Sequence, residues 1–273
     1  MSHDQVALVT GVTGTIGRAV AAELGARGAA LMLTGRRKDV LDEVAAELRG
    51  RGARVEIAAG DVADPAHADE AVARETESYG SVTILMNNAG GGSGTGVPNA
   101  ESDPLAWRES LLTNTYGPYL FARAVLPAML RAGRGRIITV ASRLGTAAIP
   151  TASAYAVAKT AVMRLSETIA AETQGTGVVA FSLHPGDIVS GINATKIKAG
   201  LVSADKFLDS AEAAASVIGE LAAGHYDVLS GAYLDVGDNL VALAEQRARQ
   251  SVPARVLSVA DLPDEFRGRP IYN

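Results

Sequence analysis

Short, continuously apolar runs alternate along this chain with longer amphipathic segments, and this alternation constrains the fold more than any other feature. The apolar runs lie at residues 5–10, 30–34, 54–59, 83–86, 136–141, 178–183 and 232–236. Strands that read as continuously apolar are typically buried on both faces of a sheet. Helical patterns separate them at residues 16–27, 39–51, 66–79 and 105–131. This order predicts an α/β fold, with a doubly wound parallel sheet and helices on both faces.

The composition excludes several classes of protein. The 273 residues are 48% apolar, which is enough to fill the core of one large domain. Cysteine is absent, so disulfide frameworks, thiolate zinc sites and cysteine nucleophiles are excluded, and we expect no metal site. The net charge of −5 argues against a nucleic-acid partner. No apolar run approaches the ~18 residues of a membrane span, and no signal-peptide pattern opens the chain, so we expect a cytoplasmic enzyme without a membrane partner.

A glycine-rich loop follows the first predicted strand directly. Glycines in such a loop allow a tight turn and a close approach of the backbone to a pyrophosphate, and the amino end of the next helix favours the phosphate charge. A bare structural turn is the alternative, but the position between the first strand and the first helix favours a nucleotide site. The loop residues expected to bind the nucleotide are Gly11, Thr13, Gly14, Thr15, Ile16 and Gly17.

The end of the second predicted strand indicates which nucleotide is bound. An acidic residue there would accept hydrogen bonds from the adenosine ribose. This chain instead has Gly35 followed by Arg36 and Arg37, whose guanidinium groups match a phosphate dianion. The pattern favours NADP(H), with NAD(H) possible, although a solvated basic turn would look the same. Asp61, after the third strand, fits a contact to adenine or an ordinary acidic turn.

Further polar motifs follow the later strands in a fixed order. They are Asn87-Asn88-Ala89-Gly90, then Asn114, then Ser142, then Tyr155 with Lys159 four residues on, and finally His184-Pro185-Gly186. Together with the glycine loop, this order resembles the short-chain dehydrogenase/reductase family over roughly residues 5–240.

The resemblance implies a single Rossmann-like domain at residues 1–240, with a seven-stranded sheet of order 3-2-1-4-5-6-7 and a substrate lid at residues 187–210. We expect residues 241–273 to form an irregular tail, frayed or lying over a neighbouring subunit, because the family forms homodimers or homotetramers. The further cofactor contacts that it implies are Val62, Asn88, Ala89, Gly90, Tyr155, Lys159, Pro185, Gly186, Ile188 and Ser190.

The chemistry expected of the site rests on Tyr155 and Lys159. Residues four apart share one face of a helix, so the two side chains should lie together. A phenol has a reference pKa of about 10. A nearby ammonium, together with the positive nicotinamide of the oxidised cofactor, should lower the pKa of Tyr155 so that it can exchange a proton. Ser142 can hydrogen-bond the substrate oxygen as negative charge develops. In the family, the residue that matches Asn114 anchors a water that relays protons to the lysine. Taken singly, each of these four residues is more often structural.

Two departures from the family pattern leave alternatives open. The glycine spacing T-G-x-x-G-x-x-G, with Thr15 where a glycine is usual, is similar to that of the longer epimerases and dehydratases, although the chain is too short for their second domain. Arg143 stands where a small residue is frequent; it faces an acidic substrate group or forms a salt bridge at a subunit contact. His184 is expected to make a structural hydrogen bond, and Lys196, Lys198 and Lys206 to form a solvated face or to steer an anion.

The sequence thus predicts an NADP(H)-dependent reductase or dehydrogenase acting on a small carbonyl or alcohol substrate. A hydride would pass between the nicotinamide and the substrate carbon while Tyr155 exchanges the proton. The alternatives are an epimerase or dehydratase that uses its cofactor transiently, and a non-catalytic regulator that senses the nucleotide.

Overall fold

Seven parallel strands form one sheet in the computed structural model, which describes residues 5–189, 197, 203, 205, 207 and 209–249. Nearly every side chain of the central strands is buried, as the continuous apolar runs predict. The strands are β1 Val6–Thr10, β2 Ala30–Gly35, β3 Val55–Ala59, β4 Ile84–Asn87, β5 Gly135–Val140, β6 Val178–His184 and β7 Tyr233–Asp235.

The sheet order is β3-β2-β1-β4-β5-β6-β7, so the predicted fold class and strand order are confirmed. The strand order reverses between β1 and β4, which pair side by side with Ala7 opposite Ile84. In an open parallel sheet, ligands bind beyond the carboxyl ends of the strands at such a reversal. The fold therefore directs the search for a site to the loops that follow β1 and β4.

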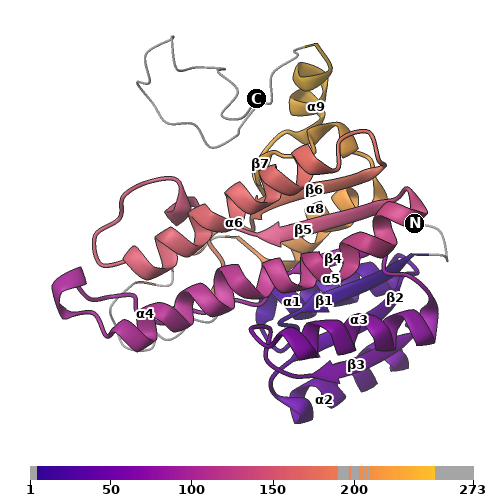
Figure 1. Cartoon of the computed structure of the whole chain (residues 1–273), viewed down its shortest axis with the longest axis horizontal. Coiled ribbons are helices and arrows are strands. Elements are labelled where there is room, and N and C mark those ends of the chain that lie inside the picture. Colours follow the sequence, from indigo (N-terminus) through magenta and orange to yellow (C-terminus); the bar gives the residue numbers. More distant parts are fainter. Residues whose placement is uncertain are drawn as a thin grey trace.

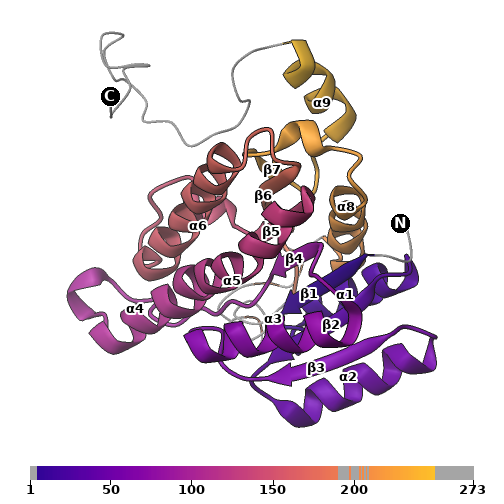
Figure 2. The same ribbon diagram turned by 45° about the vertical axis from the view of Figure 1, so that its right-hand side comes forward.

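Helices cover both faces of the sheet and enclose two apolar cores (Figures 1 and 2). On one face lie α1 Thr15–Ala26, α2 Lys38–Gly50 and α8 Ala211–Ala223. On the other lie α3 Pro65–Tyr79, α5 Gly117–Ala132 and α6 Ser153–Glu172, whereas α4 Pro104–Leu111 projects beyond the sheet and packs against α6 (Figure 1). In the part of the chain that the structure describes, no helix is long and apolar enough to cross a membrane.

The helix expected at residues 105–131 is not uniformly α-helical. A π-helical turn, Leu112–Tyr116, separates α4 from α5. A π turn inserts one residue into a helix and widens it locally, and such turns are frequent at functional sites. Asn114, a candidate site residue, is buried within this turn.

The irregular tail expected from residue 241 onward is wrong over its first part. Residues Leu240–Arg249 form α9, because the segment is rich in Ala, Leu, Glu, Gln and Arg, which favour helices. Leu240 is buried, and Leu243 and Ala244 pack against the core of the α1 face. The rest of the tail, and most of the predicted lid at residues 187–210, lie outside the described residues.

Candidate active site

The glycine loop joins β1 to α1 with its backbone packed closely against the end of β4. Gly11 has φ +72°, and a Cβ atom there would lie 2.7 Å from the Cα atom of Ala89. A Cβ atom on Gly17 would lie 2.5 Å from the carbonyl oxygen of Gly11. These two glycines are thus required by packing. The loop leads to the amino end of α1, where Gly14 precedes the helix without a side-chain cap. Uncapped helical N–H groups form a binding site for an anion.

A cleft of about 240 Å³ lies over this loop, at the reversal of strand order. The structure brings together in it all the nucleotide contacts predicted from the first four strands: Gly11, Thr13, Gly14, Thr15, Ile16, Gly17, Arg36, Arg37, Asp61, Val62, Asn88, Ala89 and Gly90. The side chains of Arg36 and Arg37 are exposed, and Arg37 Nη2 donates to the carbonyl oxygen of Thr13 at 3.1 Å. The loop backbone and the helix end fit the pyrophosphate of a dinucleotide.

A hydrogen-bond network holds the two sides of this cleft in register. Thr10 Oγ1 accepts hydrogen bonds from the backbone N–H groups of Asn88 and Ala89, each at 3.0 Å. Asn88 Nδ2 donates back to the carbonyl oxygens of Thr10 and Gly11 at 2.9 and 3.1 Å. Asn88 therefore fixes the start of the glycine loop, a scaffolding role alongside its predicted contact with the cofactor.

Three of the four predicted catalytic residues meet beside this cleft. Ser142 lies two residues after the end of β5, and Tyr155 and Lys159 lie one turn apart on α6, as the i, i+4 spacing predicts. The Lys159 ammonium lies 5.5 Å from the centroid of the Tyr155 ring and donates to the carbonyl oxygen of Val140 at 2.8 Å. Ser142 Oγ accepts a hydrogen bond from the Leu144 N–H at 3.2 Å, and the Ser142 and Tyr155 hydroxyls are hydrogen-bonded.

Burial governs the charge states of the pair. It raises the pKa of Tyr155 above its ordinary value, more than the hydrogen bond to Ser142 lowers it. Removal of the phenol from water is the largest influence on this pKa in the folded chain. The lowered pKa expected from the sequence also depends on the positive nicotinamide of the oxidised cofactor, and it stays a prediction. Burial also lowers the pKa of Lys159 to about 8. At neutral pH the site holds a neutral phenol beside a largely charged amine.

Asn114, the fourth predicted catalytic residue, lies behind the cleft and bonds to backbone. Its Nδ2 donates to the carbonyl oxygens of Ser110 and Gly91, both at 2.9 Å, and its Oδ1 accepts from the Gly91 N–H at 3.3 Å. A Cβ atom on Gly90 would lie 2.9 Å from Asn114 Oδ1 and 3.7 Å from Lys159 Nζ. Asn114 thus lies across Gly90 from the lysine.

Ser142, Tyr155 and Lys159 line a second cleft of about 460 Å³, a volume within the usual range for small-molecule sites. It shares Ile16, Asn88 and Gly90 with the nucleotide cleft, so the two are continuous. The predicted contacts Pro185, Gly186 and Ile188 also line it, whereas Ser190 and the lid lysines lie outside the described residues. Among the described residues, no group of acidic and histidine side chains could hold a metal ion.

Arg143 and His184 have surroundings that the sequence did not predict. Arg143 lines the second cleft and forms salt bridges within its own chain, with Asp235 and Asp187. Its predicted contact with an acidic substrate group or with another subunit stays a prediction. His184 lines the second cleft, but neither of its buried ring nitrogens has a hydrogen-bond partner in the part of the chain described. Burial lowers its pKa despite the carboxylates of Asp235 and Asp187 nearby, so the ring is neutral at pH 7.

Sequence reasoning missed several lining residues. Gly35 and Gly60 line the nucleotide cleft, and their positions at the ends of β2 and β3 could have identified them. The segment Ile149–Ala152 before α6 carried no such signal. Its four residues line the second cleft, and Thr151 has φ +63°, an uncommon backbone conformation for a β-branched residue.

Comparisons with known proteins identify relatives of this chain. Residues 5–199 match the model of the short chain dehydrogenase family. A protein of Streptomyces violaceoruber, assigned as ketoacyl reductase 1 of the granaticin polyketide synthase, is 40% identical over 183 residues, which span 66% of each chain, slightly less than two thirds. The short chain dehydrogenase mpl6 of Monascus purpureus is 32% identical over 255 residues, covering 90% of this chain and 85% of that protein.

A solved structure of similar fold is that of a variant of the actinorhodin polyketide ketoreductase, determined with NADPH. Its TM-score is 0.80 at 27% sequence identity, and the match covers 88% of this chain and 98% of that one.

Proposed function

Since the chain belongs to the short-chain dehydrogenase family, we propose that it is an NADP(H)-dependent oxidoreductase that interconverts a ketone and a secondary alcohol. One observation carries the proposal: Ser142, Tyr155 and Lys159 line a cleft that is continuous with the glycine-rich nucleotide cleft. The NADPH complex of the actinorhodin ketoreductase, a structural relative, supports it.

The bound nicotinamide would supply the hydride in reduction and accept it in oxidation. In reduction, Tyr155 Oη donates its proton to the carbonyl oxygen, while Ser142 Oγ donates a hydrogen bond to the same oxygen as negative charge develops. The Lys159 ammonium stabilises the phenolate that remains. In oxidation, the phenolate takes the proton from the alcohol. Burial raises the pKa of the phenol, so at neutral pH Tyr155 is in the protonated form that donates in reduction.

A matched pair of tyrosine variants tests this assignment. The assay is the loss of NADPH absorbance with cyclohexanone, acetophenone and ethyl acetoacetate. General acid catalysis is worth ~10²–10⁴-fold, so Tyr155→Phe should lower kcat by that factor and leave NADPH affinity unchanged. Tyr119→Phe changes an exposed tyrosine on α5 and should retain full activity. Near-wild-type turnover by Tyr155→Phe would refute the mechanism, and nucleotide binding without turnover of any ketone or alcohol would support a sensor.

The preference for NADP(H) is proposed from Arg36 and Arg37, which would hold the additional phosphate of the adenosine ribose. A hydrogen bond to a charged group is worth about 1.5–3 kcal/mol, so Arg36→Ala or Arg37→Ala should weaken NADPH binding by about 10–100-fold. The affinity for NADH should stay unchanged. Arg51→Ala, at the far end of α2 from the cleft, is the control. Equal losses for both nucleotides would refute the proposed preference.

We propose that the chain forms a homo-oligomer through the outer surface of α4, α5 and α6. Leu105 is 72% exposed there, and Tyr116 and Tyr119 stack on each other at the surface. Large exposed apolar side chains gathered on one surface indicate association. Light scattering should show a dimer or tetramer that Tyr119→Asp dissociates and Val228→Asp, at another exposed position, does not. A monomeric wild type would refute this proposal. The predicted cytoplasmic location and the boundary at residue 240 stay predictions.

A further inference from the structure

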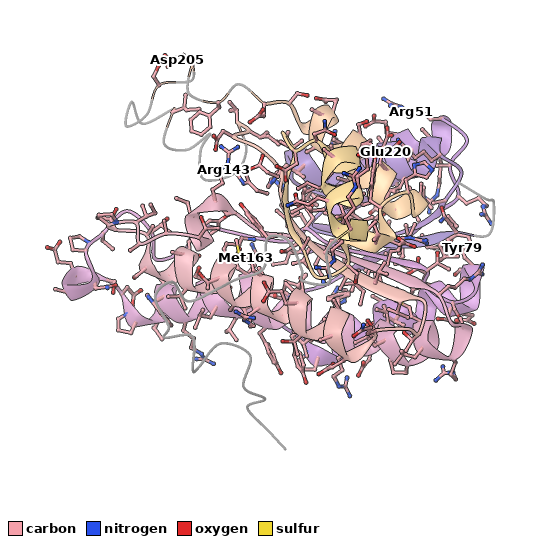
Figure 3. All side chains as sticks on the ribbon, turned by 90° about the horizontal axis from the view of Figure 1, so that it is seen from above. Arg51, Tyr79, Arg143, Met163, Asp205 and Glu220 are labelled. Carbon is pink, nitrogen blue, oxygen red and sulfur yellow. The ribbon has the colours of Figure 1, made fainter. Side chains whose placement is uncertain are left out.

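Arg143 joins the carboxyl ends of three neighbouring strands beside the catalytic cleft. Its Nε and Nη2 atoms donate to the two carboxylate oxygens of Asp235 at 2.7 and 3.1 Å. Its Nη1 donates to Asp187 Oδ2 at 3.4 Å. Arg143 follows β5, Asp187 follows β6, and Asp235 ends β7. Figure 3 shows Arg143 on the opposite side of the view from Arg51 and Tyr79, which precede the amino ends of β3 and β4.

The geometry of this cluster is that of a strong ion pair. An exposed pair of flexible side chains contributes little, but a bidentate arginine–carboxylate pair is an exception. The Asp235 side chain is only 13% exposed, and its Oδ1 also accepts the Gly237 N–H at 3.1 Å, which fixes the carboxylate. The Asp187 N–H donates to Asp209 Oδ2 at 2.7 Å, so this partner of Arg143 is anchored as well.

Arg143 also belongs to the turn that positions the catalytic serine. Ser142 caps the short 3₁₀ helix Arg143–Gly145, with its Oγ accepting from Leu144 N–H and its carbonyl accepting from Gly145 N–H at 2.9 Å. The far end of this turn is tied to α6, because Thr160 Oγ1 donates to the carbonyl oxygen of Gly145 at 2.7 Å. The near end is tied to β7 by Arg143. The Ser142 hydroxyl is thus held between two anchors.

We propose that Arg143 is a positioning residue of the reaction. Through Asp235 and Asp187 it clamps the Ser142 turn to the ends of β6 and β7, and thereby sets the position of the Ser142 hydroxyl relative to Tyr155. We name Arg143, Asp187 and Asp235 the strand-end clamp. The inference rests on the proposed function, because it assigns Arg143 to the same reaction. Its guanidinium is occupied by carboxylates of its own chain, so it acts through them and not as the receptor of an acidic substrate.

The kinetic test compares Arg143→Ala with Arg143→Lys and with a double variant that also carries Asp235→Asn. A displacement of about 1 Å at a distance from the chemistry can lower a rate by ~10²-fold, so we expect Arg143→Ala to lower kcat/KM for a ketone about tenfold, with NADPH affinity unchanged. Most of the loss should fall on kcat, because the hydrogen bond from Ser142 strengthens in the transition state. Arg143→Lys cannot form the bidentate pair and should lose an intermediate amount. Adding Asp235→Asn to Arg143→Ala should cause no further loss.

A second measurement makes the inference testable without turnover. Hydrogen–deuterium exchange on the protein without nucleotide should quicken in Arg143→Ala at residues 141–146, 185–189 and 233–237, the three segments that the strand-end clamp joins, and not elsewhere. Arg136→Ala is the matched control, because Arg136 forms a similar bidentate pair with Asp227, at 2.9 and 2.6 Å, at the opposite end of β5. This control should retain kcat/KM and normal exchange at these three segments.

The outcomes separate the two proposals. If the wild type reduces none of the ketones, the proposed function fails, whereas the exchange experiment still decides whether the clamp exists. In an active wild type, an unchanged kcat/KM for Arg143→Ala overturns the positioning role. Equal effects of Arg136→Ala on kcat/KM would also overturn it, since a general loss of stability would then explain both variants.

Discussion

Burial of the Lys159 ammonium should make this lysine a cost to the stability of the protein. Its side chain is 3% exposed, and its pKa falls from 10.5 to about 8. At about 1.36 kcal/mol per pH unit, this difference opposes folding by about 3 kcal/mol at neutral pH. The hydrogen bond to Val140 is worth about 1 kcal/mol in return. Lys159→Met, which keeps the apolar stem, should therefore stabilise the protein by about 2 kcal/mol at pH 7, while abolishing turnover.

The sign of the pH dependence follows from proton binding. Between pH 8 and pH 10.5 the unfolded chain holds the proton on Lys159 and the folded protein does not. The wild type therefore becomes more stable as pH rises from 8 to 10.5 and less stable as pH falls back through the same window. The advantage of Lys159→Met should shrink by about 2 kcal/mol between pH 7 and pH 9.5.

Urea denaturation at a single protein concentration measures both effects. Lys38→Met is the control, because Lys38 lies exposed at the start of α2 and pairs with Asp42. Its substitution should change the free energy of unfolding by at most ~0.5 kcal/mol at either pH. A Lys159→Met protein that is less stable at pH 7, or whose advantage does not vary with pH, would refute the reasoning.

Three further predictions concern a buried carboxyl group, a residue with a strained backbone and a closely packed glycine. Both carboxylate oxygens of buried Glu75 lack hydrogen-bond partners among the described residues, and burial raises the pKa of this carboxyl well above the usual 4.5, so wild-type stability should fall as pH rises from 4.5. In urea denaturation at pH 7, Glu75→Met should gain about 1–3 kcal/mol, and an equal gain at pH 4 would contradict this explanation. Thr151→Asn should raise the thermal midpoint, with a gain of ~0.5–1 kcal/mol in the free energy of unfolding, because Asn tolerates the left-handed backbone region. Thr151→Val should give no gain, and equal effects of the two variants would show that the φ angle is not the cause. Gly17→Ala should lower the free energy of unfolding by about 1–3 kcal/mol and weaken NADPH binding in fluorescence titration. Gly14→Ala should change little, because a Cβ atom there would lie 3.5 Å from its nearest neighbour, and a well-tolerated Gly17→Ala would refute the packing argument.

Much of the fold could be predicted from the sequence because its signals are local. All seven strands lie within the predicted apolar runs or a residue beyond them, since strands buried on both faces permit few polar residues. The glycine loop and the i, i+4 spacing of Tyr155 and Lys159 have similarly direct local meanings. These signals predicted a site at the carboxyl ends of the strands, where the structure has both clefts.

The sequence is less informative where contacts distant along the chain decide the outcome. Arg143 is bound by Asp235, 92 residues away, and no pattern around Arg143 indicates this partner. The shift in the pKa of Tyr155 depends on how far the folded chain removes the phenol from water, and the spacing to Lys159 does not reveal this. The helix at Leu240–Arg249 was missed because the prolines that follow it suggested an irregular segment throughout.

The π-helical turn Leu112–Tyr116 has a consequence for the outer surface as well as for Asn114. Each residue advances an α-helix by about 100°, so the residue added in the wide turn rotates the apolar stripe of α5 by about that angle relative to α4. Deleting a single residue there would restore a regular helix. The stacked pair Tyr116 and Tyr119 would then swing to a different side of the helix axis. The extra residue in this turn therefore determines both the position of the Asn114 amide near Lys159 and the direction in which Tyr116 and Tyr119 face.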